Sequence, residues 1–141
     1  YVKSLGAKIS YDLAAPFAVS TNRNELEYLL PKIDILFSTE EEALELTGKE
    51  PISALSELSE ICPIAIMKSG KNGSIIKKGS DKFIIPVYKV DVVNTNGAGD
   101  TYSAGFIHEY LKGSDLESCG HFASKLASKV CAREEPYFTN H

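Results

Sequence analysis

One stretch of the sequence places glycines next to a carboxylate in a pattern that suits phosphate chemistry. Residues 94–100 read Asn-Thr-Asn-Gly-Ala-Gly-Asp, after an apolar, strand-like run and before a run with helical spacing. Glycines at the start of a helix let backbone N–H groups approach an anion closely. The helix dipole adds to that attraction. The pattern therefore indicates a candidate anion site at a strand-to-helix turn.

Asp100 needs a role at such a turn, because its carboxylate would repel a bound phosphate. As a general base, it would take the proton from a substrate hydroxyl while that oxygen attacks a phosphoryl group. The neighbouring amides would stabilise the charge on the transferring group. The alternative is a glycine-rich connection with Asp100 in an ordinary first helical turn. A short glycine motif does not by itself decide between the two.

Composition and charge narrow the class of protein. The chain has 141 residues, of which 43% are apolar and 24% charged, and its net charge is −4. These values suit a single globular domain and disfavour a nucleic-acid partner, which would require a basic face. No apolar run approaches the ~20 residues of a membrane span, and the first ten residues lack a signal-peptide pattern. Three widely spaced cysteines without a CxxC indicate reduced, small core side chains and a cytoplasmic protein: Cys62, Cys119 and Cys131.

Strands alternate with helices along the chain, which predicts a mostly parallel sheet covered by helices and one α/β domain over residues 1–141. In such sheets, ligands bind at the carboxyl ends of the strands. The expected strands span residues 7–13, 33–37 and 63–67, with a hairpin of 74–78 and 82–86. The expected helices span residues 22–30, 39–47, 97–111 and 116–132, and a further one opens at Pro51 and includes Ile61.

Residues 94–107 resemble the second signature of the ribokinase/PfkB kinases. That signature is an Asp-Thr-x-Gly-Ala-Gly-Asp turn, three variable residues, a small pair and then apolar residues. Residues 13–17, 30–37 and 119–124 look like the corresponding segments of the adenosine kinase branch. The resemblance covers almost the whole chain, and its glycine signature is far more specific than a lone GxGxxG.

The resemblance implies a three-layer α/β/α ribokinase-like (Rossmann-like) fold, a mostly parallel sheet with a β-hairpin. Complete family members carry a preceding N-terminal part with further strands, a β lid and most substrate contacts. The implied reaction uses ATP and Mg²⁺ to phosphorylate the 5′-hydroxyl of adenosine, giving AMP in purine salvage. A sugar or another nucleoside as acceptor, and a nucleotide-binding pseudokinase, remain open alternatives. Without the N-terminal part, the 141 residues alone are expected to be inactive.

The resemblance also assigns roles to individual residues. Asp100 matches the catalytic base, and Gly97, Ala98 and Gly99 match the anion hole. The remaining matches concern the nucleoside and the nucleotide. They are Asn96 at the ribose of the substrate, Gly70 and Gly73 beside the nucleotide, and His121 at the border of the adenine pocket.

Three positions depart from the family pattern. The family's Asn-x-x-Glu motif, associated with Mg²⁺ and phosphate, is represented here by Thr39 and Glu42. A Thr hydroxyl can still bind a metal-bound water, with a shorter reach. The first Asp of the glycine signature is Asn94, which keeps a turn-forming side chain but loses a charge. A usual Thr is replaced by Lys68, which either contacts a phosphate or is solvated.

Several of these residues also have ordinary structural interpretations. Glu40 and Glu41 suit a solvated helix start that complements the dipole. His121 could be a packing residue of a helix surface. Tyr102 and Phe106 lie four apart on one helix face and are expected in the core. The lysines of the predicted hairpin suit a polar face: Lys77, Lys78 and Lys82.

Overall fold

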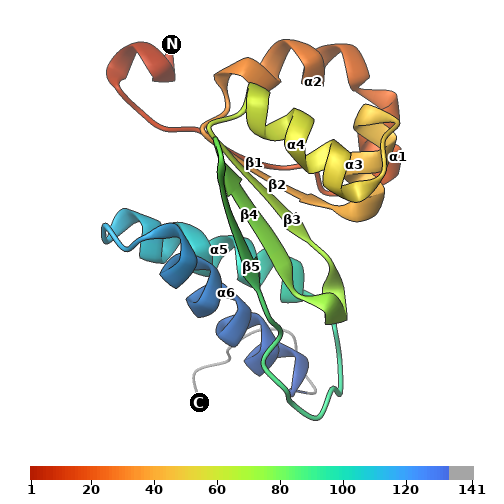
Figure 1. Ribbon diagram of the computed structural model, residues 1–141, viewed down its shortest axis with the longest axis vertical. Coiled ribbons are helices and arrows are strands. Elements are labelled where there is room, and N and C mark those ends of the chain that lie inside the picture. Colours follow the sequence, from red (N-terminus) through yellow and green to blue (C-terminus); the bar gives the residue numbers. More distant parts are fainter. Residues whose placement is uncertain (134–141) are drawn as a thin grey trace. The chain divides into compact units, whose positions relative to one another are not determined.

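The computed structural model describes residues 1–133 and has an α/β architecture built on a five-stranded mixed sheet, as the sequence predicts (Figure 1). The strand order is β1-β2-β3-β4-β5. The strands are β1 (Ser10–Asp12), β2 (Ile35–Thr39), β3 (Ile64–Lys68), β4 (Ser74–Lys78) and β5 (Asp81–Ile85). β4 and β5 are joined by two residues, which confirms the predicted hairpin.

The backbone contacts group the chain into two compact units. The first comprises Tyr1–Ser69 with Ile75–Lys82, and the second comprises Gly70–Ser74 with the described residues from Phe83 onward. The expectation of one domain over residues 1–141 stays a prediction.

In the first unit, β1, β2 and β3 pair in parallel. Asp12 lies opposite Phe37 in the register of β1 and β2, and Thr39 lies opposite Lys68 in that of β2 and β3. Parallel strands run in one direction, so their carboxyl ends meet at the same edge of the sheet. Residues Ile35 to Ser38 of β2 are buried on both faces, as expected for a central parallel strand.

Four α-helices belong to the first unit: α1 (Pro16–Thr21), α2 (Arg23–Leu29), α3 (Glu40–Thr47) and α4 (Pro51–Ile61). Figure 1 shows them gathered on one side of the parallel strands, and α3 packs on α4, β2 and β3. α3 ends at Gly48, whose φ of 69° is the left-handed conformation that stops a helix. Short 3-10 turns span Val2–Leu5 and Leu30–Lys32. The core beneath these helices includes Val19, Leu36, Leu55, Leu58 and Met67.

The second unit is dominated by α5 (Ala98–Leu111) and α6 (Leu116–Cys131), which pack on each other. Gly105 permits the close approach, because a Cβ there would lie 3.3 Å from the Cα of Ala123. Tyr102 and Phe106 are buried, which confirms their expected core positions. Phe122 of α6 is 38% exposed.

Three parts of the chain differ from the sequence-based expectation. α1 was not predicted, and it begins with Pro16 at its first turn, where proline is well tolerated. The apolar run before residue 94, predicted to be strand-like, forms no strand over residues 87–93. The expected strand 7–13 is reduced to Ser10–Asp12. All residues from 87 to 93 are exposed. Apolar side chains with β propensity do not form a strand unless a neighbouring strand pairs with them.

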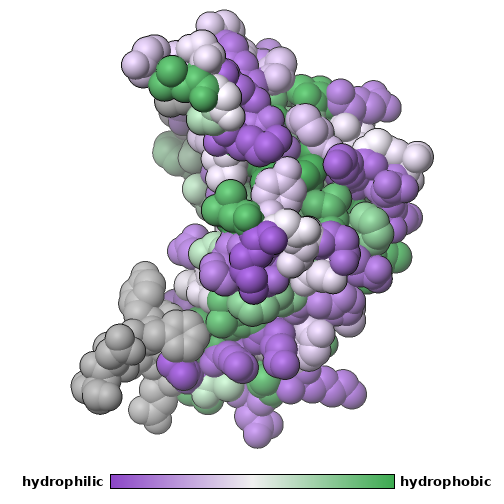
Figure 2. Space-filling view, turned by 90° about the vertical axis from the view of Figure 1, so that its left-hand side faces the viewer, coloured by the Kyte–Doolittle hydropathy of each residue, from purple (hydrophilic) through white to green (hydrophobic). Residues whose placement is uncertain are grey.

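Apolar side chains also reach the surface elsewhere. On the face shown in Figure 2, hydrophobic residues are scattered among hydrophilic ones. Exposed examples are Phe17, Tyr28, Ile84, Val92 and Val93. Within residues 1–133, no helix combines the length and apolarity that crossing a membrane requires.

Gly73 provides a test of the backbone fold. Its φ is +89°, and a Cβ there would lie 2.1 Å from the carbonyl oxygen of Ile85. Gly73→Ala should therefore destabilise the protein by about 2–4 kcal/mol, through steric overlap and left-handed strain. The matched control is Gly79→Ala, because Gly79 has a φ of +58° with nothing within 4 Å of its Cβ position. Its cost should be about 1 kcal/mol. Equal losses of thermal stability by circular dichroism would contradict the close approach of Gly73 to β5.

Candidate functional site

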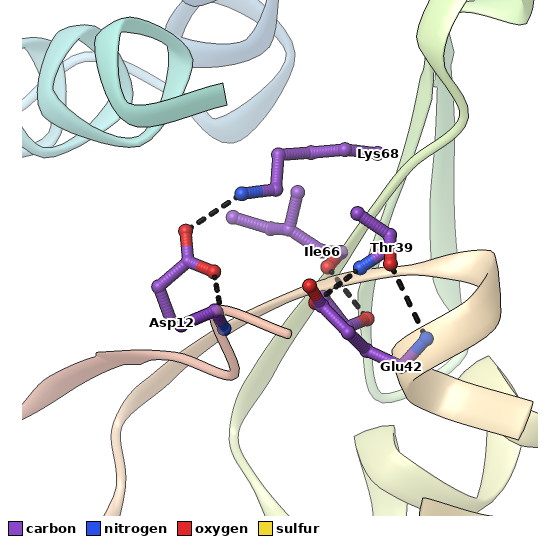
Figure 3. Close-up of polar contacts among 7 residues, drawn as sticks. Asp12, Thr39, Glu42, Ile66 and Lys68 are labelled. Atoms are coloured by element: carbon purple, nitrogen blue, oxygen red, sulfur yellow. Dashed lines mark hydrogen bonds and ion pairs between the residues drawn. The ribbon is translucent and has the colours of Figure 1, made fainter. Parts of the chain in front are cut away.

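The carboxyl ends of β1, β2 and β3 bring polar side chains together in the first unit (Figure 3). Nζ of Lys68, at the end of β3, lies 2.6 Å from Oδ2 of Asp12, at the end of β1. The other carboxylate oxygen of Asp12 accepts the N–H of Ala14 at 3.3 Å. The Lys68 and Asp12 side chains are only 14% and 28% exposed. The alternative of a solvated Lys68 is therefore wrong: its ammonium forms a partly buried ion pair.

Asp12 was not identified from the sequence. Asp12 and Lys68 are 56 positions apart. They meet because β1 and β3 flank β2 on opposite sides and end at the same edge. A signal was present in the carboxylate within the expected strand 7–13, but its partner depends on the strand order.

Thr39 and Glu42 form a reciprocal cap at the start of α3, next to the ion pair. The Thr39 hydroxyl accepts the N–H of Glu42 at 3.2 Å, and Oε2 of Glu42 accepts the N–H of Thr39 at 2.8 Å. This capping box satisfies two backbone donors and orients the Glu42 side chain, which is only 4% exposed. One carboxylate oxygen of Glu42 thus has a structural role.

The residues predicted to bind a metal suit Mg²⁺ in kind and number. Carboxylate and hydroxyl oxygens are hard ligands, and Mg²⁺ in nucleotide sites is held by one or two carboxylates, waters and phosphate oxygens. Glu42 and Thr39 could supply such a limited set. No group of three or more His, Cys, Asp or Glu side chains suited to a metal occurs within residues 1–133.

In the second unit, the predicted anion turn leads into α5 as the sequence suggests. Gly97 is the N-cap, with φ 75° and ψ 0°, in the left-handed region that glycine adopts readily. Oδ1 of Asn94 accepts the N–H of Asn96 at 2.8 Å. This confirms that Asn keeps the turn-forming role expected at position 94.

Asp100 lies in the first turn of α5 and is exposed, as are Gly99 and Asn96. An exposed carboxylate in the first turn is accessible to a substrate hydroxyl and interacts favourably with the helix dipole. The N–H of Ala98 donates to the carbonyl of Thr95 at 3.2 Å. An anion that binds the Ala98 amide would have to replace this bond.

The second predicted glycine turn lies between β3 and β4. Gly70 and Gly73 have φ values of 52° and 89°, and the N–H of Gly73 donates to the carbonyl of Gly70 at 3.1 Å. A 3-10 turn spans Gly70–Asn72. Both glycines are thus required by the local backbone conformation, and a role beside a nucleotide stays a prediction.

His121 lies on α6, where its Nδ1 is 3.1 Å from the hydroxyl of Tyr88 and the two rings meet edge to face. Tyr88 was not identified from the sequence, because it lies in a run of residues without regular structure. Nearby, the Ser124 hydroxyl donates to the carbonyl of Pro86 at 2.7 Å. These contacts join the segment after β5 to α6.

Buried protonated groups support α5 and the core. The Tyr102 hydroxyl lies 2.6 Å from the Ser74 hydroxyl, and burial raises the pKa of Tyr102 to about 12. Burial likewise raises the pKa of the Cys62 and Cys119 thiols to about 11. These thiols stay protonated near neutral pH, which disfavours a nucleophilic role. Cys62 and Cys119 are buried as expected, whereas Cys131 is partly exposed.

The predicted site residues therefore form local groups within each unit. Asp12, Lys68, Thr39 and Glu42 lie at the strand ends of the first unit. In the second unit, residues 94–97 form the turn before α5, and Gly99 and Asp100 lie in its first turn. Gly70 and Gly73 lie in the turn before β4, and His121 contacts Tyr88.

Comparisons with known proteins identify relatives of this chain. The model of the pfkB family of carbohydrate kinases matches residues 4–141. A nucleoside kinase from Methanothermobacter thermautotrophicus is 36% identical over 135 residues, which is 95% of this chain and 43% of that protein.

Solved structures agree on the fold. A probable sugar kinase from Rhizobium etli and an adenosine kinase from Sinorhizobium meliloti each match with a TM-score of 0.90, at 32% and 30% identity. Each match covers 95% of this chain and 42% of the other protein. The fold is thus ribokinase-like, and the chain spans less than half the length of these relatives.

Two substitutions at Thr39 should differ in their effect on the stability of α3, because Thr39 caps this helix. Thr39→Ala removes the side-chain acceptor and should destabilise the start of α3 by about 1 kcal/mol. Thr39→Asn restores the residue of the family motif and an equally good N-cap acceptor, so α3 should keep its stability. Hydrogen exchange of peptides covering residues 39–47 measures the difference directly. Equal protection in both variants would contradict the capping role of the Thr39 hydroxyl.

Proposed function

Because the chain belongs to the PfkB family of carbohydrate kinases, we propose that the complete protein containing it transfers the γ-phosphoryl group of ATP to the 5′-hydroxyl of adenosine. The products are AMP and ADP. The observation that carries the proposal is the turn at the start of α5, where left-handed Gly97 precedes an exposed Asp100 in the first helical turn.

In this proposal, Asp100 is the general base. Its carboxylate accepts the proton of the acceptor hydroxyl as that oxygen forms a bond to the γ-phosphorus. The bond from the γ-phosphorus to the bridging oxygen breaks at the same time, and ADP leaves with that electron pair. Exposure of Asp100 supports this role, because a hydroxyl must approach the carboxylate within hydrogen-bond distance.

The anion hole is assigned to the backbone around Gly97, Ala98 and Gly99. The N-terminus of α5 favours the negative charge that develops on the phosphoryl oxygens. Glycine at 97 and 99 leaves the backbone open to an oxygen, whereas the Ala98 amide must first exchange its bond to Thr95. The amide of Gly99 is accordingly the stronger candidate donor.

The remaining polar cluster is assigned to the phosphates and Mg²⁺. Glu42 and the Thr39 hydroxyl would hold the ion, directly or through water, and Lys68 would contact a phosphate oxygen. Bound Mg²⁺ supplies positive charge that neutralises the phosphates. Burial of Glu42 and its fixed orientation in the capping box support a preorganised ligand.

Nucleoside recognition is assigned to the second unit. Asn96 would contact the ribose of the acceptor, Gly70 and Gly73 would lie beside the nucleotide, and His121 would border the adenine. The contact between His121 and Tyr88 supports an ordered aromatic wall at that position.

The choice of adenosine is supported by relatives named as nucleoside and adenosine kinases. The second candidate is a sugar or another nucleoside as acceptor, favoured by the match to a probable sugar kinase. A nucleotide-binding pseudokinase is the third, motivated by Thr39 and Asn94 in place of the family's Asn and Asp.

The active unit is also proposed to be longer than these 141 residues. The relatives are more than twice as long as the match, so the active unit is proposed to include a preceding part with the lid and most substrate contacts. The 141 residues alone should then be inactive, because water is not excluded from the site. Purine salvage in the cytoplasm is the proposed setting, with no nucleic-acid or membrane partner.

Phosphoryl transfer by the complete protein tests the proposal. Adenosine, other nucleosides, ribose and fructose 6-phosphate are compared as acceptors, with ADP release as the measurement. Adenosine should be preferred, and Asp100→Asn should lower kcat by roughly 10²–10⁴-fold, because the proton acceptor is lost. The control is Asp81→Asn, at an exposed position of β5, which should leave kcat unchanged.

The outcomes separate the three candidates. Preference for another acceptor, with the same loss in Asp100→Asn, would keep the mechanism and reject adenosine. ATP binding without any acceptor would favour the pseudokinase. An Asp100→Asn variant as active as the unsubstituted protein would reject the general-base role.

A further inference from the structure

We propose that Asp12 is a positioning residue that holds the Lys68 ammonium ready for a phosphate oxygen of the bound nucleotide. The inference rests on the proposed function of the complete protein as an ATP-dependent kinase. It assigns a role to Asp12, which acts on the nucleotide only through Lys68. The carrying observation is the partly buried 2.6 Å ion pair between the ends of β1 and β3 (Figure 3).

The position of the pair suits a ligand of a parallel sheet. Asp12 ends β1 and Lys68 ends β3, so the two side chains meet at the carboxyl edge, beside the end of β2. This is the edge at which parallel α/β sheets bind ligands. Thr39 and Glu42, the candidate Mg²⁺ residues, start from the same edge. A cation held there is suited to an anionic group that also carries a metal ion.

The Asp12 carboxylate is itself fixed by an unusual turn. Ala14 is the one residue other than glycine with positive φ in residues 1–133, at 69°. The N–H of Ala15 donates to the carbonyl of Leu13 at 2.9 Å, which closes a tight γ-turn around Ala14. Oδ1 of Asp12 accepts the Ala14 N–H, so Oδ2 is directed toward Lys68. Backbone strain of this kind persists where the surrounding structure holds it in place.

Asp12 favours phosphate binding by Lys68 through two physical effects. A lysine side chain is flexible, so an ammonium already held in one position loses less conformational entropy when a ligand binds. Lys68 is also only 14% exposed, and a charge in such a position is stabilised by an opposite charge. Because an ammonium has three N–H donors, it can bind a carboxylate and a phosphate oxygen together.

The opposite effect would be competition. The Asp12 carboxylate also repels a phosphate, and its removal would then strengthen nucleotide binding. Positioning should prevail, because Lys68 lies between the carboxylate and the ligand in this account and shields the repulsion. The two effects predict opposite changes in affinity, which makes the proposal testable.

A double-mutant cycle on MgATP binding tests the proposal in the complete protein. Dissociation constants are measured by isothermal titration calorimetry for the unsubstituted protein, Asp12→Asn, Lys68→Met and the double variant. Lys68→Met should weaken binding by about tenfold or more, the usual scale for a lost charge-assisted hydrogen bond. Asp12→Asn should weaken it by about three- to tenfold alone, and by no further factor in the Lys68→Met background. Lys68→Arg should retain part of the affinity.

A second ion pair provides the matched control. Lys3 and Asp34 also lie 2.6 Å apart, and Asp34 directly precedes β2, at the opposite end of that strand. Asp34→Asn breaks a pair of equal length away from the candidate site and should leave the dissociation constant of MgATP unchanged. Thermal unfolding of each variant shows whether the protein remains folded.

The outcomes either support or overturn the role of Asp12. Tighter or unchanged binding by Asp12→Asn would overturn it, as would an equal loss in both backgrounds. Failure of the unsubstituted protein to bind MgATP would overturn both this inference and the proposed function. If MgATP binds but no acceptor is phosphorylated, the proposed reaction fails, whereas the cycle still decides the role of Asp12.

Discussion

Parallel pairing of β1, β2 and β3 is the constraint on which the first unit depends. It forces three chain segments, separated by helices, to end at one edge of the sheet. Asp12 and Lys68 can form an ion pair across the end of β2 because both strands end at that edge. The same constraint places the start of α3 there, with its Thr39–Glu42 cap. Opposite charges, a hydroxyl and a buried carboxylate thus gather at the ends of the parallel strands.

A different physical effect operates at α5. There the backbone provides the positive potential, because the N–H groups of the first turn point along the helix axis toward the turn of residues 94–97. Left-handed Gly97 and the Asn94 side chain shape that turn. Asp100 adds a carboxylate in the same first turn, which is the proton acceptor in the proposed mechanism. Phosphoryl transfer needs these three properties together: electrostatic stabilisation, close approach and a base.

Local signals made much of the fold predictable. A capping threonine and a stopping glycine delimit α3, and glycines delimit α5. α1 was missed because its six residues offer too short a pattern, and residues 87–93 were misjudged because strand pairing is not a local property. At the site, Asp100, Glu42 and Lys68 were predicted from motif position. Asp12 was not, because its role depends on the order of strands in the sheet.

A crystal structure of the complete protein with Mg²⁺, adenosine and a non-hydrolysable ATP analogue tests the central claim most directly. We expect phosphate oxygens within hydrogen-bond distance of the backbone at Gly97–Gly99, with the Asp100 carboxylate on the 5′-hydroxyl of adenosine. Nucleotide bound away from the start of α5, or an Asp100 carboxylate remote from the acceptor hydroxyl, would contradict the account.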